Sequence, residues 1–211
     1  MPEGHEYSAD YYDFSRPGAG IKSKVDTLRD SLIRRQILQR VPGGALLDVG
    51  CGIGMFLQTM AADFQLYGID ISSFAIKTCA KRLPDAQLAV GSLIDGLPFD
   101  RDFDVISAIN VMEHLEDPAA AARAVRSRLR VGGLFVTHLP TIGNRVQARF
   151  YRGSYDQDPT HIYRPSGADY QRLVRRAGFD CIYNSYAPFL GAPLWRRLPI
   201  HPAHIAIFRA R

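Results

Sequence analysis

The stretch Asp48-Val49-Gly50-Cys51-Gly52-Ile53-Gly54 decides the fold, because a short apolar strand runs directly into three alternating glycines. The predicted strand covers residues 45–49, and Phe56, Met60 and Phe64 then recur every four residues, as one face of a helix does. Glycine tolerates positive φ and lets a ligand approach the backbone closely. A strand, a glycine-rich turn and a helix in this order predict a ligand site at the carboxyl end of the first strand of an open α/β sheet.

The rest of the chain continues to alternate short apolar strands with amphipathic helices, which is typical of a parallel sheet with crossover helices. Further strands are predicted near residues 66–70, 86–90, 103–109, 134–138, 181–186 and 204–208. Further helices are predicted near residues 24–40, 73–82, 118–130 and 166–177. No helix fits the short, Pro-interrupted stretch between the last two strands, so these should pair antiparallel. We therefore predict a doubly wound, Rossmann-like α/β fold, with a seven-stranded, mostly parallel sheet and an antiparallel last strand.

A chain of 211 residues suits a single domain. Within it we expect an N-terminal lid and helix (1–43), a cofactor-binding core (44–139), a substrate lid (140–164) and a C-terminal helix with strands (165–211). The lid is predicted because its connection far exceeds the usual ~4–6 residues. Tyrosines are the candidate walls of an acceptor pocket: Tyr11, Tyr151 and Tyr155.

Composition narrows the class of protein. The chain is 46% hydrophobic and 22% charged, as globular proteins are, and no apolar run reaches the ~18–20 residues of a membrane span. The three cysteines are odd in number and far apart, which favours neither disulfides nor a metal site, and no secretory leader is predicted, so we expect a cytoplasmic protein. The charge of +5 is scattered, which argues against a nucleic-acid partner. Arg196-Arg197, after Leu194-Trp195, is either a solvated turn or a contact to an anionic substrate or a membrane surface.

The glycine spacing distinguishes between two kinds of nucleotide ligand. A nicotinamide-binding loop reads G-x-G-x-x-G, and its third glycine would fall at Met55. Asp70 ends the second predicted strand twenty positions after Gly50, where a carboxylate can accept hydrogen bonds from two adjacent ribose hydroxyls. Together these features predict a nucleoside ligand without a pyrophosphate.

Four segments carry a resemblance to a known family. The run 48–54 resembles the first motif of the class I S-adenosylmethionine-dependent methyltransferases, and the run 67–72 resembles their second. Asn110-Val111-Met112-Glu113-His114-Leu115-Glu116-Asp117-Pro118 resembles the segment after their fourth strand, and Leu129-Arg130-Val131-Gly132-Gly133 the turn into their fifth. The run Glu113–Pro118 and the later run Asp158-Pro159-Thr160-His161 are similar to the small-molecule branch that includes the quinone-biosynthesis O-methyltransferases.

The resemblance implies S-adenosylmethionine as cofactor and a set of residues around it: Asp48, Gly50, Cys51, Gly52, Asp70, Ile71, Ser92, Leu93 and Asn110. In this family the glycine loop faces the methionine part, with Asp48 nearby, and Asp70 holds the ribose. Ser92 and Leu93 would flank the adenine, although an acidic residue often stands where this chain has Ser92. Asn110 would meet the amino-acid end of the cofactor.

Methyl transfer to a hydroxyl requires a positioned acceptor and removal of a proton, so a general base is expected. The candidate catalytic residues are His114 and His161, whose side chains titrate near neutral pH, and Glu113. Each has an alternative structural role, as a helix-entry, loop-packing or charge-balancing residue. No metal site is expected, because His201 and His204 have no further ligand nearby in the sequence.

The sequence thus predicts an enzyme that methylates a small molecule, on oxygen or alternatively on nitrogen. A nucleic-acid methyltransferase is a rival, but Asn110 is followed by Val111-Met112 rather than by the Pro-Pro-aromatic motif of enzymes that methylate exocyclic base amines. Two further rivals are a non-catalytic S-adenosylmethionine-binding module and a nicotinamide oxidoreductase.

Overall fold

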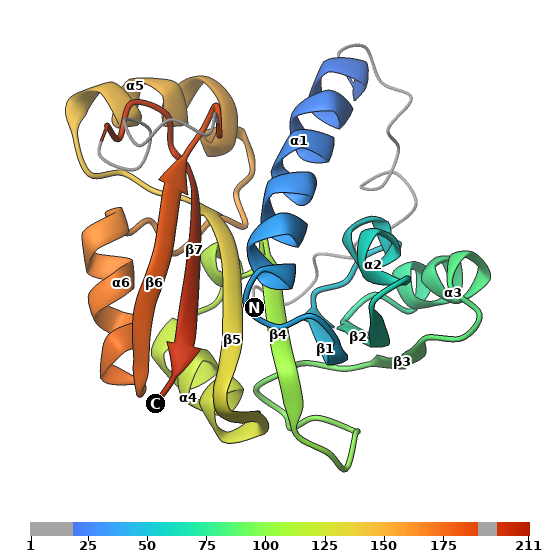
Figure 1. The fold of residues 1–211 in the computed structure, drawn as a ribbon. Helices are drawn as coiled ribbons and strands as arrows, with labels where there is room; N and C mark the ends of the chain where they lie inside the picture. Colours follow the sequence, from blue (N-terminus) through green and yellow to red (C-terminus); the bar gives the residue numbers. More distant parts are fainter. Residues whose placement is uncertain (1–18, 190–197) are drawn as a thin grey trace.

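A computed structural model describes residues 19–189 and 198–211 of the chain (Figure 1). Tyr11 and the pair Arg196-Arg197, for which the sequence suggested binding roles, lie outside these residues. No helix within the two described ranges is both long enough and apolar enough to cross a membrane.

Seven strands form one sheet in the order β3-β2-β1-β4-β5-β7-β6. Their bounds are β1 Gly44–Val49, β2 Phe64–Asp70, β3 Gln87–Val90, β4 Phe103–Ile109, β5 Leu129–Pro140, β6 Phe179–Tyr186 and β7 Ala203–Ala210. Neighbouring strands from β3 to β5 pair parallel, whereas β7 runs antiparallel to both β5 and β6. The predicted doubly wound sheet with an antiparallel last strand is confirmed.

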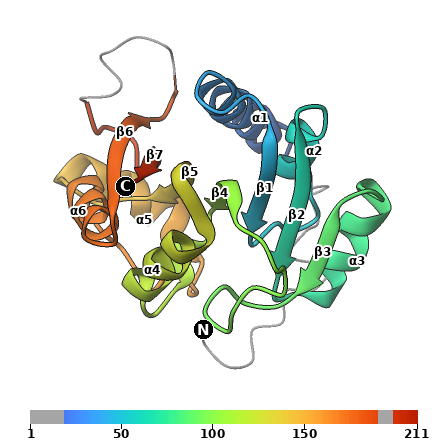
Figure 2. The ribbon, with the colours of Figure 1, turned by 60° about the horizontal axis from the view of Figure 1, so that its bottom comes forward.

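Helices cover both faces of this sheet (Figure 2). On one face lie α1 (Ala19–Leu38), α2 (Met55–Met60) and α3 (Ser73–Arg82), whose apolar side chains share a core with Leu46 and Val105. On the other face lie α4 (Pro118–Arg128) and α6 (Gly167–Arg176), packed over Leu47 and Phe135. Alternate residues of each strand therefore enter different cores, as the two-residue repeat of a strand requires.

Among the element boundaries that differ from the sequence prediction, two concern residues that the sequence assigned to a different element or to a break. Phe64 does not continue the helix face of Phe56 and Met60; it begins β2, where it pairs with Gly44 of β1. The glycine pair Gly132-Gly133 does not simply precede the fifth strand but lies within β5, which begins at Leu129. Apolar spacing by four cannot distinguish the last turn of a short helix from the first residue of the next strand.

The predicted lid contains a helix, α5 (Arg145–Ser154), and a 3₁₀ turn, η2 (Tyr155–Gln157). Asn144 begins α5, because its side-chain oxygen accepts hydrogen bonds from the backbone N–H groups of Val146 and Gln147. Strands β1, β4 and β5 are parallel, so the segments that follow them lie at the same end of the sheet, the carboxyl end of these strands. These segments are the glycine loop after β1, the 3₁₀ turn η1 (Met112–His114) after β4 and α5 after β5.

Candidate functional site

A cavity of about 230 Å³ opens at the carboxyl ends of β1, β2 and β4. Its walls include seven of the nine residues predicted to surround a cofactor: Gly50, Gly52, Asp70, Ile71, Ser92, Leu93 and Asn110. Apolar residues that the sequence did not single out, such as Val49, Ile69 and Met112, complete the lining. The cavity thus lies where ligands bind in open α/β sheets.

The glycine loop is hydrogen-bonded to β2 and lies close to the segment that follows β4. The N–H groups of Gly50 and Cys51 donate to the carbonyl of Ile69 in β2, at 2.8 and 3.0 Å. Gly50 has φ +67°, and a Cβ there would lie 2.4 Å from Cγ2 of Val111. No larger residue fits without displacing the segment after β4, so glycine is required here for space as well as for backbone conformation.

Asp70 lies in the cavity wall and fastens the loops around it. Its Oδ2 accepts the N–H of Gly52 and its Oδ1 accepts the N–H of Ser72, both at 2.8 Å. Burial raises the pKa of this carboxyl, while the backbone hydrogen bonds oppose that shift. A carboxylate has about four acceptor positions, so these backbone contacts leave acceptor capacity for a ligand hydroxyl. This donor and acceptor arrangement fits the ribose of a nucleoside cofactor.

Asn110 has a backbone conformation and a side-chain partner that fix its amide. Its φ is +57°, in the left-handed region that asparagine tolerates better than most residues. The Nδ1–H of His138 donates to its Oδ1 at 2.6 Å, and burial lowers the pKa of His138 well below the usual value, so this ring is neutral at neutral pH. The oxygen of the amide is therefore occupied, and its NH₂ group remains for an acceptor in the cavity.

Asp48 and Cys51 were also predicted to surround the cofactor, but their side chains do not line this cavity. Asp48 is 2% exposed, accepts a hydrogen bond from the Ser107 hydroxyl at 2.7 Å and has its pKa raised to about 8 by burial. The thiol of Cys51 is buried against β2, where a Cβ on Gly68 would lie 2.9 Å from it. Both side chains are thus buried in the protein interior and do not face the cavity.

His114, at the end of η1, forms part of the cavity wall, and its tautomer follows from its partners. The Thr160 hydroxyl lies 2.5 Å from Oδ1 of Asp158, a carboxylate whose pKa is lowered by its hydrogen bonds with Thr160, so the hydroxyl donates there. The same hydroxyl, 2.8 Å from Nδ1 of His114, must then accept a hydrogen bond, as must the Thr160 carbonyl at 3.2 Å. His114 therefore carries its proton on Nδ1, which leaves Nε2 as a free base.

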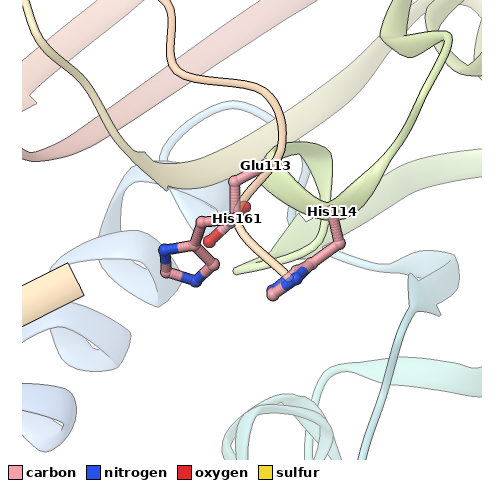
Figure 3. Close-up of side chains that lie close together, drawn as sticks. All are labelled: Glu113, His114 and His161. Atoms are coloured by element: carbon pink, nitrogen blue, oxygen red, sulfur yellow. The ribbon is translucent and has the colours of Figure 1, made fainter. Parts of the chain in front are cut away.

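All three predicted catalytic residues come together, although His161 is far from the other two in sequence (Figure 3). One nitrogen or oxygen of each of Glu113, His114 and His161 lies within 4.8 Å of the others, and all three side chains are buried. Two imidazoles and a carboxylate are also a ligand type that divalent cations such as Zn²⁺ use. Glu113 and His161, unlike His114, do not line the cavity.

The surroundings of Glu113 and His161 differ from those of His114. Burial raises the pKa of Glu113 to about 8, and its Oε2 has no hydrogen-bond partner among the described residues. His161 lies against the rings of Tyr151 and Tyr155, and its Nδ1 is 3.4 Å from the Tyr151 hydroxyl. Its Nε2 lies 3.6 Å from Asp158, which makes its shorter contacts with Thr160. Asp158 thus orients His114 through Thr160 more directly than it orients His161.

Comparison with known proteins places this site in a family. A family model described as a methyltransferase domain matches residues 22–184. A ubiquinone biosynthesis O-methyltransferase from Nitrosospira multiformis is 30% identical over 74% of this chain and 70% of its own length. The chain belongs to the S-adenosylmethionine-dependent methyltransferases. A probable S-adenosylmethionine-dependent methyltransferase from Mycolicibacterium smegmatis is 28% identical over 79% of this chain and 63% of its own.

Solved structures agree on the fold of the methyltransferase. An S-adenosylmethionine-dependent methyltransferase from Clostridium acetobutylicum superposes with a TM-score of 0.69 at 12% identity, covering 87% of this chain and 91% of that one. Magnesium protoporphyrin IX methyltransferase from Synechocystis, solved with bound SAH, gives a TM-score of 0.67 at 15% identity over 97% and 96% of the two chains. The Rossmann-like fold is therefore that of this enzyme class. Membership of the family, shown by the family model and the relatives above, makes S-adenosylmethionine the cofactor of this enzyme.

Proposed function

We propose that this methyltransferase acts on a hydroxyl oxygen of a small molecule, with His114 as the general base. The observation that carries the proposal is the hydrogen-bonded series Asp158–Thr160–His114, which leaves Nε2 of a cavity-lining histidine unprotonated. Burial lowers the pKa of His114, so the ring is neutral and able to accept a proton at neutral pH.

The cavity residues would divide the work between binding and chemistry. S-adenosylmethionine supplies an electrophilic methyl group on its sulfonium sulfur. Asp70 would bind the ribose hydroxyls, Ser92 and Leu93 would lie beside the adenine, and the Asn110 amide would donate to the amino-acid end. Nε2 of His114 would take the proton of the acceptor hydroxyl, so that the oxygen could receive the methyl group while the carbon–sulfur bond breaks and S-adenosylhomocysteine leaves. A positioned base of this kind typically accelerates proton removal by about 10²–10⁴-fold.

The lid segment 140–164 belongs to this proposal, because it provides Thr160 and Asp158. The N–H of Tyr163 donates to the carbonyl of Glu113 at 2.9 Å, which fastens the end of the lid to η1. The rings of Tyr151 and Tyr155 contact each other, and the ring of Tyr155 contacts that of His161. We infer that the lid both closes the acceptor space and orients the base.

A phenolic acceptor fits this chemistry best. Phenols have a pKa near 10, so their proton must leave as the new bond forms, and a neutral imidazole suits that task. Among the relatives, one is named a ubiquinone biosynthesis O-methyltransferase and another, from Synechocystis, a 2-methyl-6-phytyl-1,4-hydroquinone methyltransferase. Both names describe ring systems that carry oxygen substituents, and we propose an acceptor of that class here.

The test is a methylation assay with phenols, sugars and amines, with S-adenosylhomocysteine formation as the readout. We expect turnover with phenols, and a loss of about 10²–10⁴-fold in kcat in His114→Gln, with the affinity for S-adenosylhomocysteine unchanged. Exclusive turnover of amines would replace oxygen by nitrogen as the acceptor atom. Turnover that is abolished by a chelator and restored by a divalent cation would instead assign Glu113, His114 and His161 to a metal.

A further inference from the structure

Four exposed apolar side chains lie together around α5, away from either core. Val146 and Phe150 stand one turn apart on α5 and are 50% and 48% exposed. Leu198 and Ile200, which precede β7, are 40% and 42% exposed. Exposed apolar residues that stand singly are ordinary, whereas a group of them indicates an interaction site.

Hydrogen bonds hold these two segments next to each other. The side chain of Asn144 donates to the carbonyl of Pro199 at 2.8 Å, and that of Gln147 donates to the carbonyl of His201 at 3.1 Å. The rings of Phe150 and His201 have their centroids 5.7 Å apart. The apolar residues of α5 and of the segment 198–201 therefore form one surface, which we call the α5 surface.

The α5 surface is also strongly basic. Arg145, Arg149 and Arg152 are exposed on the stripe of α5 next to Val146 and Phe150, and α5 contains no acidic residue. Within residues 19–189 and 198–211 these three guanidinium groups make no hydrogen bond or ion pair.

Several arginines elsewhere on the molecule pair with neighbouring carboxylates. Arg130 lies 2.6 Å from a carboxylate oxygen of Asp104, and Arg34 lies 2.5 Å from one of Asp63. The three charges of α5 thus have no carboxylate partner among the described residues and can contact an external anion.

The surface has a defined place relative to the cavity. α5 follows the carboxyl end of β5 and lies across that end of the sheet, the edge at which the glycine loop and η1 also stand (Figure 1). The buried side of α5 presents Tyr151, which contacts His161, so the helix has the catalytic residues on one side and the exposed surface on the other.

We propose that the α5 surface docks this methyltransferase on a bilayer that contains anionic phospholipids. A short helix with exposed apolar residues beside unpaired arginines is the pattern of an element that lies in the membrane interface. The apolar side chains enter the headgroup boundary while the arginines contact lipid phosphates. Docked in this way, the enzyme turns toward the bilayer the end of the sheet at which the cavity lies.

Two other occupants fit the surface less well. A second copy of this chain related by a two-fold axis would bring like-charged helices face to face, because such an interface pairs a patch with itself. A nucleic acid would satisfy the arginines but would leave Val146, Phe150, Leu198 and Ile200 without apolar contacts.

The experiment measures partition of the full chain onto vesicles of phosphatidylcholine alone and of phosphatidylcholine with 30% phosphatidylglycerol. We expect at least about tenfold tighter binding to the anionic vesicles. Arg145→Gln/Arg149→Gln should lose about tenfold or more on anionic vesicles. Val146→Ser/Phe150→Ser should lose binding to a similar extent.

Matched controls lie at distant surfaces. Arg175→Gln/Arg176→Gln removes two exposed arginines from α6, and Val131→Ser removes an 82% exposed apolar side chain at the opposite end of β5. Both controls should bind vesicles as the wild type does, and all variants should keep the wild-type affinity for S-adenosylhomocysteine.

Three results would overturn the proposal. The first is equal binding to neutral and anionic vesicles, and the second is binding that the α5 variants do not weaken. The third is a preference for an RNA homopolymer that depends on Arg145 and Arg149 but not on Val146 and Phe150.

Discussion

Nδ1 of His114 lies 2.8 Å from the hydroxyl of Thr160, a residue 46 positions away in the sequence. The contact joins the turn after β4 to the end of the lid and continues through Thr160 to the carboxylate of Asp158. A triad of this form fixes the orientation and the tautomer of a base without placing the carboxylate in direct contact with it. In the proposed mechanism Thr160 is a positioning residue, and the contribution of its hydroxyl to the rate can be measured.

Replacing Thr160 by Val should lower kcat by about 10–100-fold, because the isosteric side chain can neither accept from Nδ1 nor donate to Asp158. The affinity for S-adenosylhomocysteine, measured by calorimetry, should change little, since Thr160 does not line the cavity. Thr160→Ser is the matched control, because it keeps the hydroxyl and should recover most of the turnover. Equal rates in the Val and Ser variants would show that the hydroxyl has no part in catalysis.

The sequence revealed the half of the site that is local in the chain. The glycine loop and Asp70 are recognisable because a strand, a turn and a second strand fix their positions within about twenty residues. Thr160 could not be assigned a role, because its contact depends on how the lid folds back onto η1. The short run 158–161 was the only signal, and it pointed to His161.

Other differences have equally local causes. The resemblance implies that Asp48 lies near the cofactor. The alternation of β1 turns its side chain to the face opposite Val49, where Ser107 is its partner. The segment of α5 was predicted only as part of a long lid connection, although Asn144 is an N-cap signal that the sequence offers. Its apolar positions are partly exposed, so they do not form the periodic stripe of a helix that packs on a core.

The pH dependence of turnover should report the base. Burial lowers the pKa of His114, which Asp158 and the Thr160 carbonyl partly oppose. In the proposed mechanism the neutral ring is the active form, so kcat at saturating cofactor should be constant near neutral pH and fall only below pH 6.5. Asp158→Asn removes a charge that favours the imidazolium, so it should move this acid limb to still lower pH. An acid limb that stays the same in His114→Gln would assign it to another group.

Asp70→Ala should weaken S-adenosylhomocysteine binding by about 10–100-fold, the usual cost of losing hydrogen bonds to a charged acceptor. Part of the effect would come from Gly52 and Ser72, whose N–H groups lose their acceptor. Asp95→Ala removes an exposed carboxylate from the loop just beyond Ser92 and serves as the control for net charge. Unchanged affinity in Asp70→Ala, measured by calorimetric titration, would contradict the role of Asp70 in cofactor binding.

His204 should make the folded state sensitive to acid. Its ring is completely buried in β7, neither nitrogen has a hydrogen-bond partner among the described residues, and burial lowers its pKa to about 4. In the unfolded chain a histidine titrates near 6.5, so between pH 6.5 and 4 the unfolded state binds one more proton than the folded state. The free energy of unfolding therefore decreases as the pH is lowered through this range. At pH 4.5 this contribution amounts to about 2–3 kcal/mol.

The measurement must separate the effect of His204 on the free energy of unfolding from that of buried carboxyls, whose protonation in acid stabilises the folded state. Asp48 and Glu113 have pKa values raised to about 8, so acidification below that pH stabilises the folded state through them. His204→Phe keeps a buried ring but cannot take up a proton, and both proteins contain the same carboxyls. The difference between their free energies of unfolding, from denaturant titrations, should therefore shift by about 2–3 kcal/mol in favour of the variant between pH 7 and pH 4.5. Parallel pH profiles for the two proteins would mean that the ring of His204 already has a partner for its proton in the folded state.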